Sequence, residues 1–256
     1  MIPKIIHYCW FGGKIMNPLQ LRCIESWKTL LPDFQIKEWN ESNFDIKKYP
    51  YAKTAFEYGK YAFVADVCRL VVLYENGGLY MDLDMLVLKN LEPFLHHDFF
   101  LGFEDKKRFS AGIIGAKKNN LEIKKLISEY SKIEFNCKNP ILIPDFFISH
   151  INPSEVFAYS EEYFYPLPFS EKEKDFSPYL SENSFAVHLW DHSWIGEQDY
   201  LKNKEYVKAI MIFVVNLVNF PITRNRLYIL DFLKNLYYYV KTDIKSFFSI
   251  VNKLYL

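Results

Sequence analysis

The eight residues Gly77-Gly78-Leu79-Tyr80-Met81-Asp82-Leu83-Asp84 carry the strongest signal in this chain. Two aspartates, Asp82 and Asp84, end a short apolar run that follows a glycine pair. Side chains of an extended strand alternate between faces, so both carboxylates are expected to point the same way. Neighbouring carboxylates repel each other unless a cation or donor lies between them, and Mg²⁺ and Mn²⁺ prefer oxygen ligands. The motif predicts a metal and diphosphate site at a strand's carboxyl end; two solvated carboxylates are the alternative.

A helix is predicted directly before this stretch. Residues 61–75 place apolar side chains at helical spacing, and Asn76-Gly77-Gly78 is a stop signal because glycine adopts the left-handed backbone that ends helices. The order is then helix, glycine turn, strand and acidic pair. This order places the aspartates at the carboxyl end of a strand, where α/β proteins bind ligands.

The same alternation of strands and helices extends along the chain. We expect a strand over 4–10, a helix that begins at Asn17 or Pro18, and a half-buried strand over 34–39. Further strands are predicted over 85–88, 98–103, 111–116 and 185–190, with short aromatic strands around 156–165. Helices are predicted over 121–131 and from Tyr200 almost to the end, interrupted at Pro221. This pattern predicts an α/β fold with a parallel-rich sheet.

We expect two parts, a catalytic α/β domain over 1–200 and a basic, aromatic helical extension over 201–256. The chain is 50% hydrophobic and 24% charged, which excludes a disordered protein. Its formal net charge is zero, but the extension holds nine basic and three acidic residues. A basic aromatic segment favours contact with an anionic surface such as lipid head groups; a packing segment with a solvated basic face is the alternative.

Four cysteines without metal-binding spacing favour a reducing compartment. No signal peptide is visible before the first predicted strand, and the apolar run 209–220 is too short to span a bilayer. We therefore expect a cytoplasmic protein, peripheral on the inner face of the cytoplasmic membrane, and no nucleic-acid partner.

Two further groups of residues could bind ligand. Asp66 and Arg69 lie three positions apart on the predicted helix and share a face, so they predict either a sugar-binding pair or a helix-surface ion pair. Residues 187–194 combine His188 and His192, which could complete a metal site, with Ser193 and Trp194, whose donors suit phosphate. A satisfied histidine among core tryptophans is the alternative. Trp10, at the end of the first strand, could stack on a base or pack in the core.

In order along the chain, these motifs resemble glycosyltransferase family 32, the DXD sugar-binding transferases. The resemblance covers residues 2–195, and its motifs are 2–13, 26–27, 32–33, 39–40, 62–70, 73–74, 77–84, 186–190 and 193–194. It implies a GT-A fold, a Rossmann-like nucleotide-sugar-binding architecture, and a retaining transferase. The donor would be a nucleotide-sugar, UDP-hexose by expectation, and the cofactor Mn²⁺ or Mg²⁺. The acceptor would be a saccharide or lipid-linked sugar in surface polysaccharide synthesis, such as capsule or lipooligosaccharide.

The catalytic domains of clostridial glucosylating toxins are similar in the same motifs, and the resemblance implies roles for individual residues. Asp84 would bind the metal directly, and Asp82 would bridge the ribose and a metal-bound water. Asp66 and Arg69 would hold the donor sugar. The remaining nucleotide-sugar contacts would come from Trp10, Tyr80, Ser193 and Trp194. The third metal ligand would be His188, Asp191 or His192, with His188 favoured.

Two other classes of protein fit part of this pattern. A non-catalytic nucleotide-sugar or carbohydrate-binding protein on a GT-A scaffold would not need the complete set of metal-binding residues. The presence of both the Asp82–Asp84 pair and the Asp66–Arg69 pair in this chain argues against that class. A metal-dependent nucleotidyltransferase or phosphohydrolase normally needs more carboxylates or a basic glycine-rich loop, and neither is found in the sequence.

Overall fold

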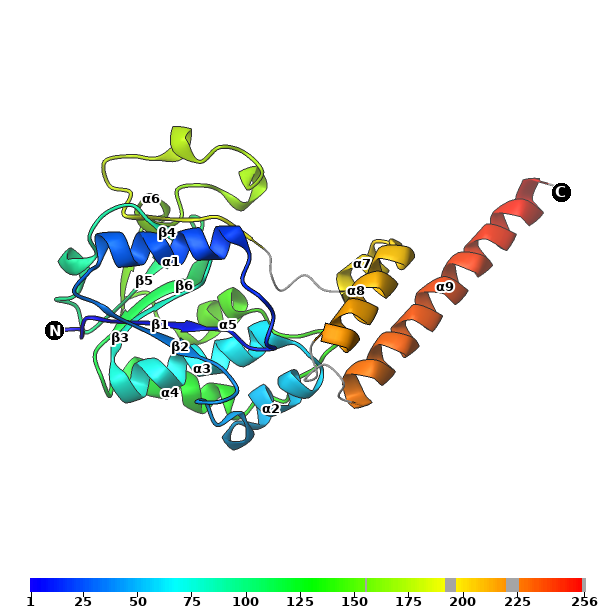
Figure 1. Ribbon diagram of the computed structural model, residues 1–256, viewed down its shortest axis with the longest axis horizontal. Helices are drawn as coiled ribbons and strands as arrows, with labels where there is room; N and C mark the ends of the chain where they lie inside the picture. The colour runs from blue at the N-terminus through cyan, green and yellow to red at the C-terminus, as the bar shows by residue number, and fades with distance from the viewer. Residues whose placement is uncertain (155, 192–196, 220–225, 255–256) are drawn as a thin grey trace.

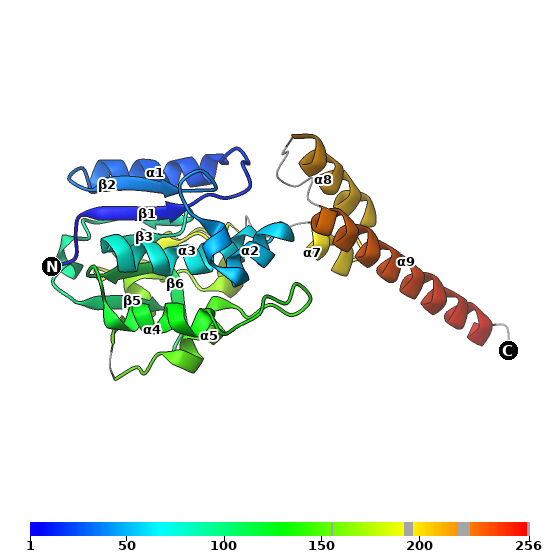
Figure 2. The ribbon, with the colours of Figure 1, turned by 90° about the horizontal axis from the view of Figure 1, so that it is seen from below.

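A computed structural model describes residues 1–154, 156–191, 197–219 and 226–254. They form an α/β body and a helical extension whose last helix runs away from that body (Figures 1 and 2). The α/β class predicted from the sequence is confirmed.

The body is built on a six-stranded sheet with the order β2-β1-β3-β6-β5-β7. Its strands are β1 (Ile5–Cys9), β2 (Gln35–Trp39), β3 (Gly78–Met81), β5 (Phe99–Phe103), β6 (Phe109–Ala116) and β7 (Phe157–Tyr159). Strand β6 runs antiparallel to both of its neighbours, while the β1–β2, β1–β3 and β5–β7 pairs are parallel. A separate antiparallel pair joins β4 (Met85–Val87) to β8 (Ala186–His188). The chain therefore leaves the main sheet after β3 and enters a second sheet at β4.

Helices cover both faces of the main sheet (Figures 1 and 2). They are α1 (Pro18–Leu30), α2 (Pro50–Glu57), α3 (Tyr61–Asn76), α4 (Leu121–Tyr130), α5 (Ile143–His150) and the short α6 (Glu161–Phe164), with 3₁₀ turns at Ile46–Lys48, Glu92–Phe94, Phe169–Glu171 and Ser177–Tyr179. The hydrophobic core consists of two clusters, one that includes residues of α1 and one that includes residues of α3 and α4. Strand β3 contributes to both, because Leu79 and Met81 pack in the first cluster and Tyr80 packs in the second. Alternation along one strand thus sends Tyr80 toward the helix that carries Asp66 and Arg69.

Local signals account for most of these elements. Asn17 caps α1 in a reciprocal capping box with Gln20, and α3 ends at Gly77, whose φ of 68° suits glycine. The expected strands within 156–165 are only partly correct, because β7 is followed by helix α6. There Ser160 and two glutamates of the first turn favour a helix start over the aromatic content. Helices α2 and α5 were not predicted; each is eight residues long and begins with a proline at its first or second position.

The extension consists of α7 (Glu197–Lys202), α8 (Tyr206–Asn219) and α9 (Arg226–Leu254), so the predicted helical character is confirmed. These helices share a small core of their own, formed by Leu201, Ala209, Phe213, Tyr228 and Phe232. Helix α9 also touches the body, since the Cys137 thiol donates to Asp231 at 3.8 Å and Tyr228 packs against Gly59. The domain boundary near residue 200 stays a prediction.

One buried histidine ties the first strands to the end of α3. The His7 side chain is fully buried, and its Nδ1 lies 3.0 Å from Trp39 Nε1, which can only donate. Nδ1 must therefore accept, and the proton on Nε2 is donated to the Gly77 carbonyl at 2.8 Å. Burial, the largest cause, and the charge of Lys37 together lower the pKa of His7 to about 4, against the opposing effect of the Gly77 carbonyl. The neutral ring is the form that this network requires.

We predict an acid-sensitive contribution of His7 to stability. An unfolded histidine titrates near 6.5 and folded His7 near 4, so the unfolded state binds the extra proton between these values. The contribution is complete above pH 6.5 and is lost as the pH falls toward 4, by up to about 3 kcal/mol. Urea unfolding of the wild type and His7→Gln at pH 7, 6 and 5 measures this. The variant should be less stable at pH 7 but show a shallower pH dependence; parallel curves would contradict the assignment.

Candidate metal and donor site

Asp82 and Asp84 lie in the turn that connects β3 to β4. The Asp82 amide donates to the Gly112 carbonyl on β6 at 2.8 Å, and the Met85 amide donates back to the Asp82 carbonyl at 3.0 Å. The expectation that strand alternation aligns the two carboxylates is therefore wrong, because this segment is a turn. The turn nevertheless brings them together with a histidine, since ligand atoms of Asp82, Asp84 and His188 all lie within 4.8 Å of one another.

Asp84 is held from the second sheet. Its Oδ1 accepts from His188 Nε2 at 3.0 Å, and its Oδ2 accepts from the Asp191 amide at 3.0 Å. The antiparallel register that pairs Met85 with His188 produces this contact. Burial acts to raise the pKa of Asp84, but the charge and hydrogen bond of His188 and the Asp191 amide together hold the pKa below its usual range. Asp84 is thus kept ionised, as a metal ligand must be.

Asp82 is held from the main sheet and from α3. The Tyr80 hydroxyl donates to Asp82 Oδ1 at 2.8 Å, and Arg69 Nη1 lies 3.3 Å from the same oxygen. The Arg69 guanidinium also sits 4.5 Å from the centre of the Tyr80 ring. Tyr80 is 1% exposed, so it contacts Asp82 and Arg69 from the protein interior. Its expected contact with the nucleotide stays a prediction.

The ion pair between Asp66 and Arg69 is buried. Arg69 Nη2 donates to Asp66 Oδ1 at 3.0 Å, Nη1 donates to the Ala111 carbonyl at 2.8 Å, and both residues are 5% exposed. The alternative of a solvated helix-surface pair is therefore excluded. Burial raises the pKa of Asp66 to about 7, with Arg69 opposing the rise and Asp82 adding to it. Arg69 links the helix to the turn that bears the acidic motif.

Two carboxylates and one imidazole fit a divalent cation of the Mn²⁺ or Mg²⁺ type. These ions prefer oxygen ligands at about 2.1 Å in octahedral geometry and leave positions for water and phosphate oxygens, so the two aspartates are the preferred donors and the imidazole of His188 is the less usual one. The three side chains lie close enough to share one such ion. His188 Nδ1 is buried without a hydrogen-bond partner in the described ranges, so Asp84 is the one hydrogen-bonding group that orients this ring.

The structure separates two of the three candidates for the third ligand, His188 and Asp191. Asp191 points its carboxylate at α1, where it accepts from Asn17 Nδ2 at 3.0 Å and from Gln20 Nε2 at 2.9 Å. Of these two described candidates, His188 is the one whose ligand atom lies near both aspartates. His192, Ser193 and Trp194 lie outside the described residues.

Trp10 directly follows β1 and is half-buried, with its indole N–H donated to the Lys14 carbonyl at 2.7 Å. Its role in stacking on a base stays a prediction. Sequence reasoning missed the backbone of β6, which supplies the Ala111 carbonyl to Arg69 and the Gly112 carbonyl to Asp82. It also missed Tyr165, whose hydroxyl accepts from the Ile113 amide at 2.8 Å and whose ring lies 5.7 Å from that of His188. Backbone acceptors leave no side-chain signal in a sequence.

Comparison with known proteins identifies the segment that carries this turn. Residues 18–101 match the model of the family described as the glycosyltransferase sugar-binding region containing the DXD motif. Asp66, Arg69 and the Asp82–Asp84 turn all fall within the matched segment, and His188 approaches it from outside. The α/β architecture, with the DXD turn at the carboxyl end of β3, agrees with the GT-A fold expected from the resemblance.

Proteins similar to this chain include two named as glycosyl-transferring enzymes. The chain is 29% identical to inositol phosphoceramide mannosyltransferase 3 of Schizosaccharomyces pombe, over 55% of this chain and 40% of that protein. It is 29% identical to lactosylceramide 4-alpha-galactosyltransferase of Rattus norvegicus, over 50% of this chain and 40% of that protein. Among solved structures, galactosyltransferase LgtC is 13% identical, covered over 80% of this chain and 94% of that chain, with a TM-score of 0.48. The chain thus spans well under two thirds of these two curated relatives.

We predict that breaking the buried ion pair is costly. Arg69→Met removes the partner of Asp66, whose buried carboxyl must then stay charged without that partner or take up a proton, so the free energy of unfolding should fall by about 3–5 kcal/mol. Lys4→Met is the matched control, because its contacts with Asp33 and Glu92 lie at the surface and their loss should cost far less than the loss of the buried pair. Adding Asp66→Asn to Arg69→Met should recover part of the loss in urea unfolding. Similar losses for the two single variants would show that the Asp66–Arg69 pair does not behave as buried.

Proposed function

We propose that this chain is a metal-dependent retaining glycosyltransferase that moves a hexose from a UDP-sugar to a saccharide or lipid-linked acceptor in surface polysaccharide synthesis. The observation that carries the proposal is the convergence of Asp82, Asp84 and His188 within a fold that contains a DXD sugar-binding region. The names of two relatives, a mannosyltransferase and a galactosyltransferase, each include a hexose and a ceramide lipid. Those names support a hexose donor and a lipid-linked acceptor for this chain.

Mn²⁺ or Mg²⁺ would be held by Asp82, Asp84 and His188. When bound, it supplies positive charge that stabilises a leaving diphosphate. Ser193 and Trp194 are proposed to donate hydrogen bonds to the diphosphate, and Trp10 to stack on the base. Tyr80 keeps Asp82 oriented through its hydroxyl, and its nucleotide contact is part of the same proposal.

Asp66 and Arg69 are proposed to hold the donor sugar. Arg69 is anchored to the Ala111 carbonyl and to Asp66, so its position is set before the donor binds. A preorganised pair of this kind lowers the barrier by orienting the reacting sugar. The acceptor hydroxyl attacks from the face that the leaving group vacates, and the departing phosphate takes its proton. This route gives retention without a protein nucleophile.

We predict that Asp84→Asn removes both transfer and donor hydrolysis. The change keeps the shape of the side chain but removes the charge, so activity with UDP-hexoses and Mn²⁺ should fall by about 100-fold or more. Asp33→Asn, at an exposed position remote from the site, is the control and should retain full activity. Chromatographic release of UDP, with and without a chelator, is the measurement. Wild-type activity in Asp84→Asn would reject this metal site.

The alternative function is a non-catalytic nucleotide-sugar-binding protein on the same scaffold. It would bind UDP-sugars in the presence of Mn²⁺ without releasing UDP over many hours. Calorimetric binding without turnover across a panel of nucleotide-sugars and acceptors would favour this alternative.

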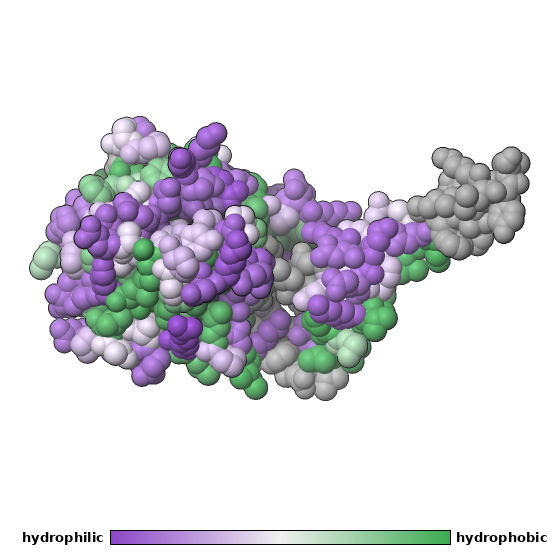
Figure 3. All heavy atoms as spheres, turned by 90° about the horizontal axis from the view of Figure 1, so that it is seen from above, coloured by the Kyte–Doolittle hydropathy of each residue, from purple (hydrophilic) through white to green (hydrophobic). Residues whose placement is uncertain are grey.

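We further propose that the extension places the enzyme at the surface of an anionic membrane. Apolar side chains stand exposed on α8 and α9, including Val207, Met211, Val214, Val215, Leu230, Leu233, Tyr237, Tyr238 and Ile244 (Figure 3). Lys234, Lys241 and Lys245 accompany them on α9, and Phe247, Phe248, Tyr239 and Lys253 continue the same composition. None of the described helices is both long and apolar enough to cross a membrane. An interfacial position suits this mixture of rings and lysines.

We predict that the chain floats with liposomes containing anionic lipid and less with neutral liposomes. Leu233→Glu combined with Tyr237→Glu should abolish flotation because each change puts a charge on the apolar face of α9. Leu21→Glu is the control, since Leu21 is 54% exposed, between Leu233 at 50% and Tyr237 at 66%, but lies on α1 of the body. Equal flotation of the two variants would remove the membrane proposal.

A further inference from the structure

Trp190 has a backbone conformation that is rare for a residue of its size. Its φ is 52°, in the left-handed region that glycine adopts readily and that larger residues avoid. It lies two residues after the end of β8, close to the acidic turn. A strained backbone persists only where the surrounding structure enforces it, and residues of this kind gather at functional sites. The conformation of Trp190 therefore calls for a physical explanation.

The residues on either side of Trp190 bind Asp84 through their backbone. The Leu189 amide donates to the Asp84 carbonyl at 2.9 Å, and the Asp191 amide donates to Asp84 Oδ2 at 3.0 Å. Continuation of the β4–β8 register would instead bring Asp191 opposite Asp82. The left-handed conformation at Trp190 ends the ladder, so the Asp191 amide meets the side chain of Asp84.

The side chain of Trp190 packs against the imidazole of His188. The two ring centroids are 4.0 Å apart and the planes are inclined at 66°, whereas the ring of Tyr165 lies 5.7 Å from the same imidazole. The indole is itself fixed, because its Nε1 donates to the Leu167 carbonyl at 2.9 Å and the ring of Phe169 meets it edge to face at 5.4 Å. An anchored indole thus borders the histidine of the candidate metal site.

These ring contacts take the place of a hydrogen bond that metal-binding histidines normally have. The ring of such a histidine is usually oriented by a hydrogen bond from its second nitrogen. His188 Nε2 lies 3.0 Å from Asp84 Oδ1, but Nδ1 is buried and has no hydrogen-bond partner among the described residues. The orientation of the imidazole therefore depends on packing as well, and Trp190 packs closer to it than Tyr165 does.

We propose that Trp190 is a positioning residue for Asp84 and His188. Its ring holds the His188 imidazole, and its backbone conformation directs the Asp191 amide to the Asp84 carboxylate. Together these contacts fix two ligands before a divalent cation binds, so less conformational entropy is lost on binding. This consequence for the cation rests on the proposed function.

Binding of Mn²⁺ to the full chain, with and without UDP, tests the role of the ring. Electron paramagnetic resonance of the free ion gives the affinity. Trp190→Leu should weaken Mn²⁺ about tenfold, as is typical when a residue that orients a metal ligand is lost. Trp190→Gly suits a φ of 52° and removes the ring without added backbone strain, so it should weaken Mn²⁺ to a similar extent. Trp190→Phe keeps an aromatic ring beside His188 and should restore most of the affinity.

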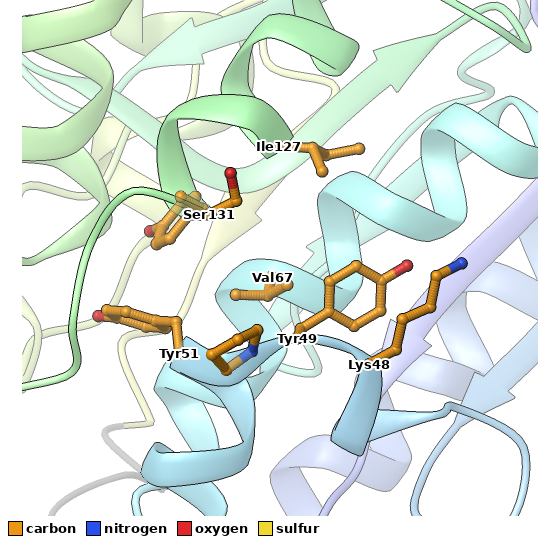
Figure 4. Close-up of a pocket in the computed structure, with 8 residues that line it drawn as sticks. Lys48, Tyr49, Tyr51, Val67, Ile127 and Ser131 are labelled. Carbon is orange, nitrogen blue, oxygen red and sulfur yellow. The ribbon is translucent and has the colours of Figure 1, made fainter.

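Two other aromatic residues provide matched controls. Phe185→Leu lies at the opposite end of β8, where the Phe185 ring packs against Phe94 at 4.8 Å and Tyr163 at 6.2 Å. Tyr49→Leu lies at a cavity of about 190 Å³ between α2, α3 and α4, where Figure 4 shows Tyr49 beside Val67. Both changes should destabilise the chain and leave its affinity for Mn²⁺ unchanged.

A double-mutant cycle in urea tests the contact between the rings without any ligand. Trp190→Leu should raise the unfolding equilibrium constant, and the rise should be several-fold smaller in a His188→Ala background, where the partner ring is already absent. Tyr49→Leu should change the constant by the same factor in both backgrounds.

Three outcomes would overturn the proposal. Wild-type Mn²⁺ affinity in both Trp190→Leu and Trp190→Gly would show that the ring does not support the metal site. Additive effects of Trp190→Leu and His188→Ala on unfolding would show that the two rings do not act on each other. An equal loss of Mn²⁺ affinity in Tyr49→Leu would show that the loss follows stability alone.

The failure of the proposed function has a different signature. If the wild-type chain binds no Mn²⁺ with or without UDP, the proposed metal-dependent function fails. The double-mutant cycle then still decides whether Trp190 holds His188.

Discussion

The buried guanidinium of Arg69 is the interaction on which the site depends. It donates to Asp66 on its own helix and to the Ala111 carbonyl on β6, lies over the ring of Tyr80 on β3, and approaches Asp82 in the turn. A buried charge is tolerated only where hydrogen bonds and opposite charges replace water. Four separate pieces of chain must therefore keep their relative positions for Arg69 to stay buried. The same requirement fixes the carboxylate of Asp82 at the rim of the site.

The acidic motif sits where the chain changes sheets. Strand β3 belongs to the main sheet and β4 to the two-stranded sheet with β8, so the turn between them is held from both sides. Asp82 is oriented by Tyr80 and Arg69, whereas Asp84 is oriented by His188 and the Asp191 amide. Each carboxylate is thus oriented by its own hydrogen-bond partners, which reduces the side-chain conformational entropy that would be lost when a metal ion binds. Asp191 in turn is bound by the capping residues of α1, so that helix also helps to define the site.

The extension differs from the body in its surface. Apolar side chains of α8 and α9, such as Met211 and Leu233, remain exposed, whereas folded proteins usually keep exposed apolar patches small. Exposed apolar surface of this kind is typical of segments that contact another surface.

Local patterns in the sequence determined much of the framework. The stop at Gly77, the cap at Asn17 and the apolar spacing of α3 depend on neighbouring residues, so they can be predicted without knowledge of the fold. Tertiary structure decided the rest. The β4–β8 register joins His188 to Asp84 across more than a hundred residues, and no local rule specifies that pairing. Packing of α3 on the sheet made Asp66–Arg69 a buried pair, because spacing along a helix sets which residues share a face but not what covers that face.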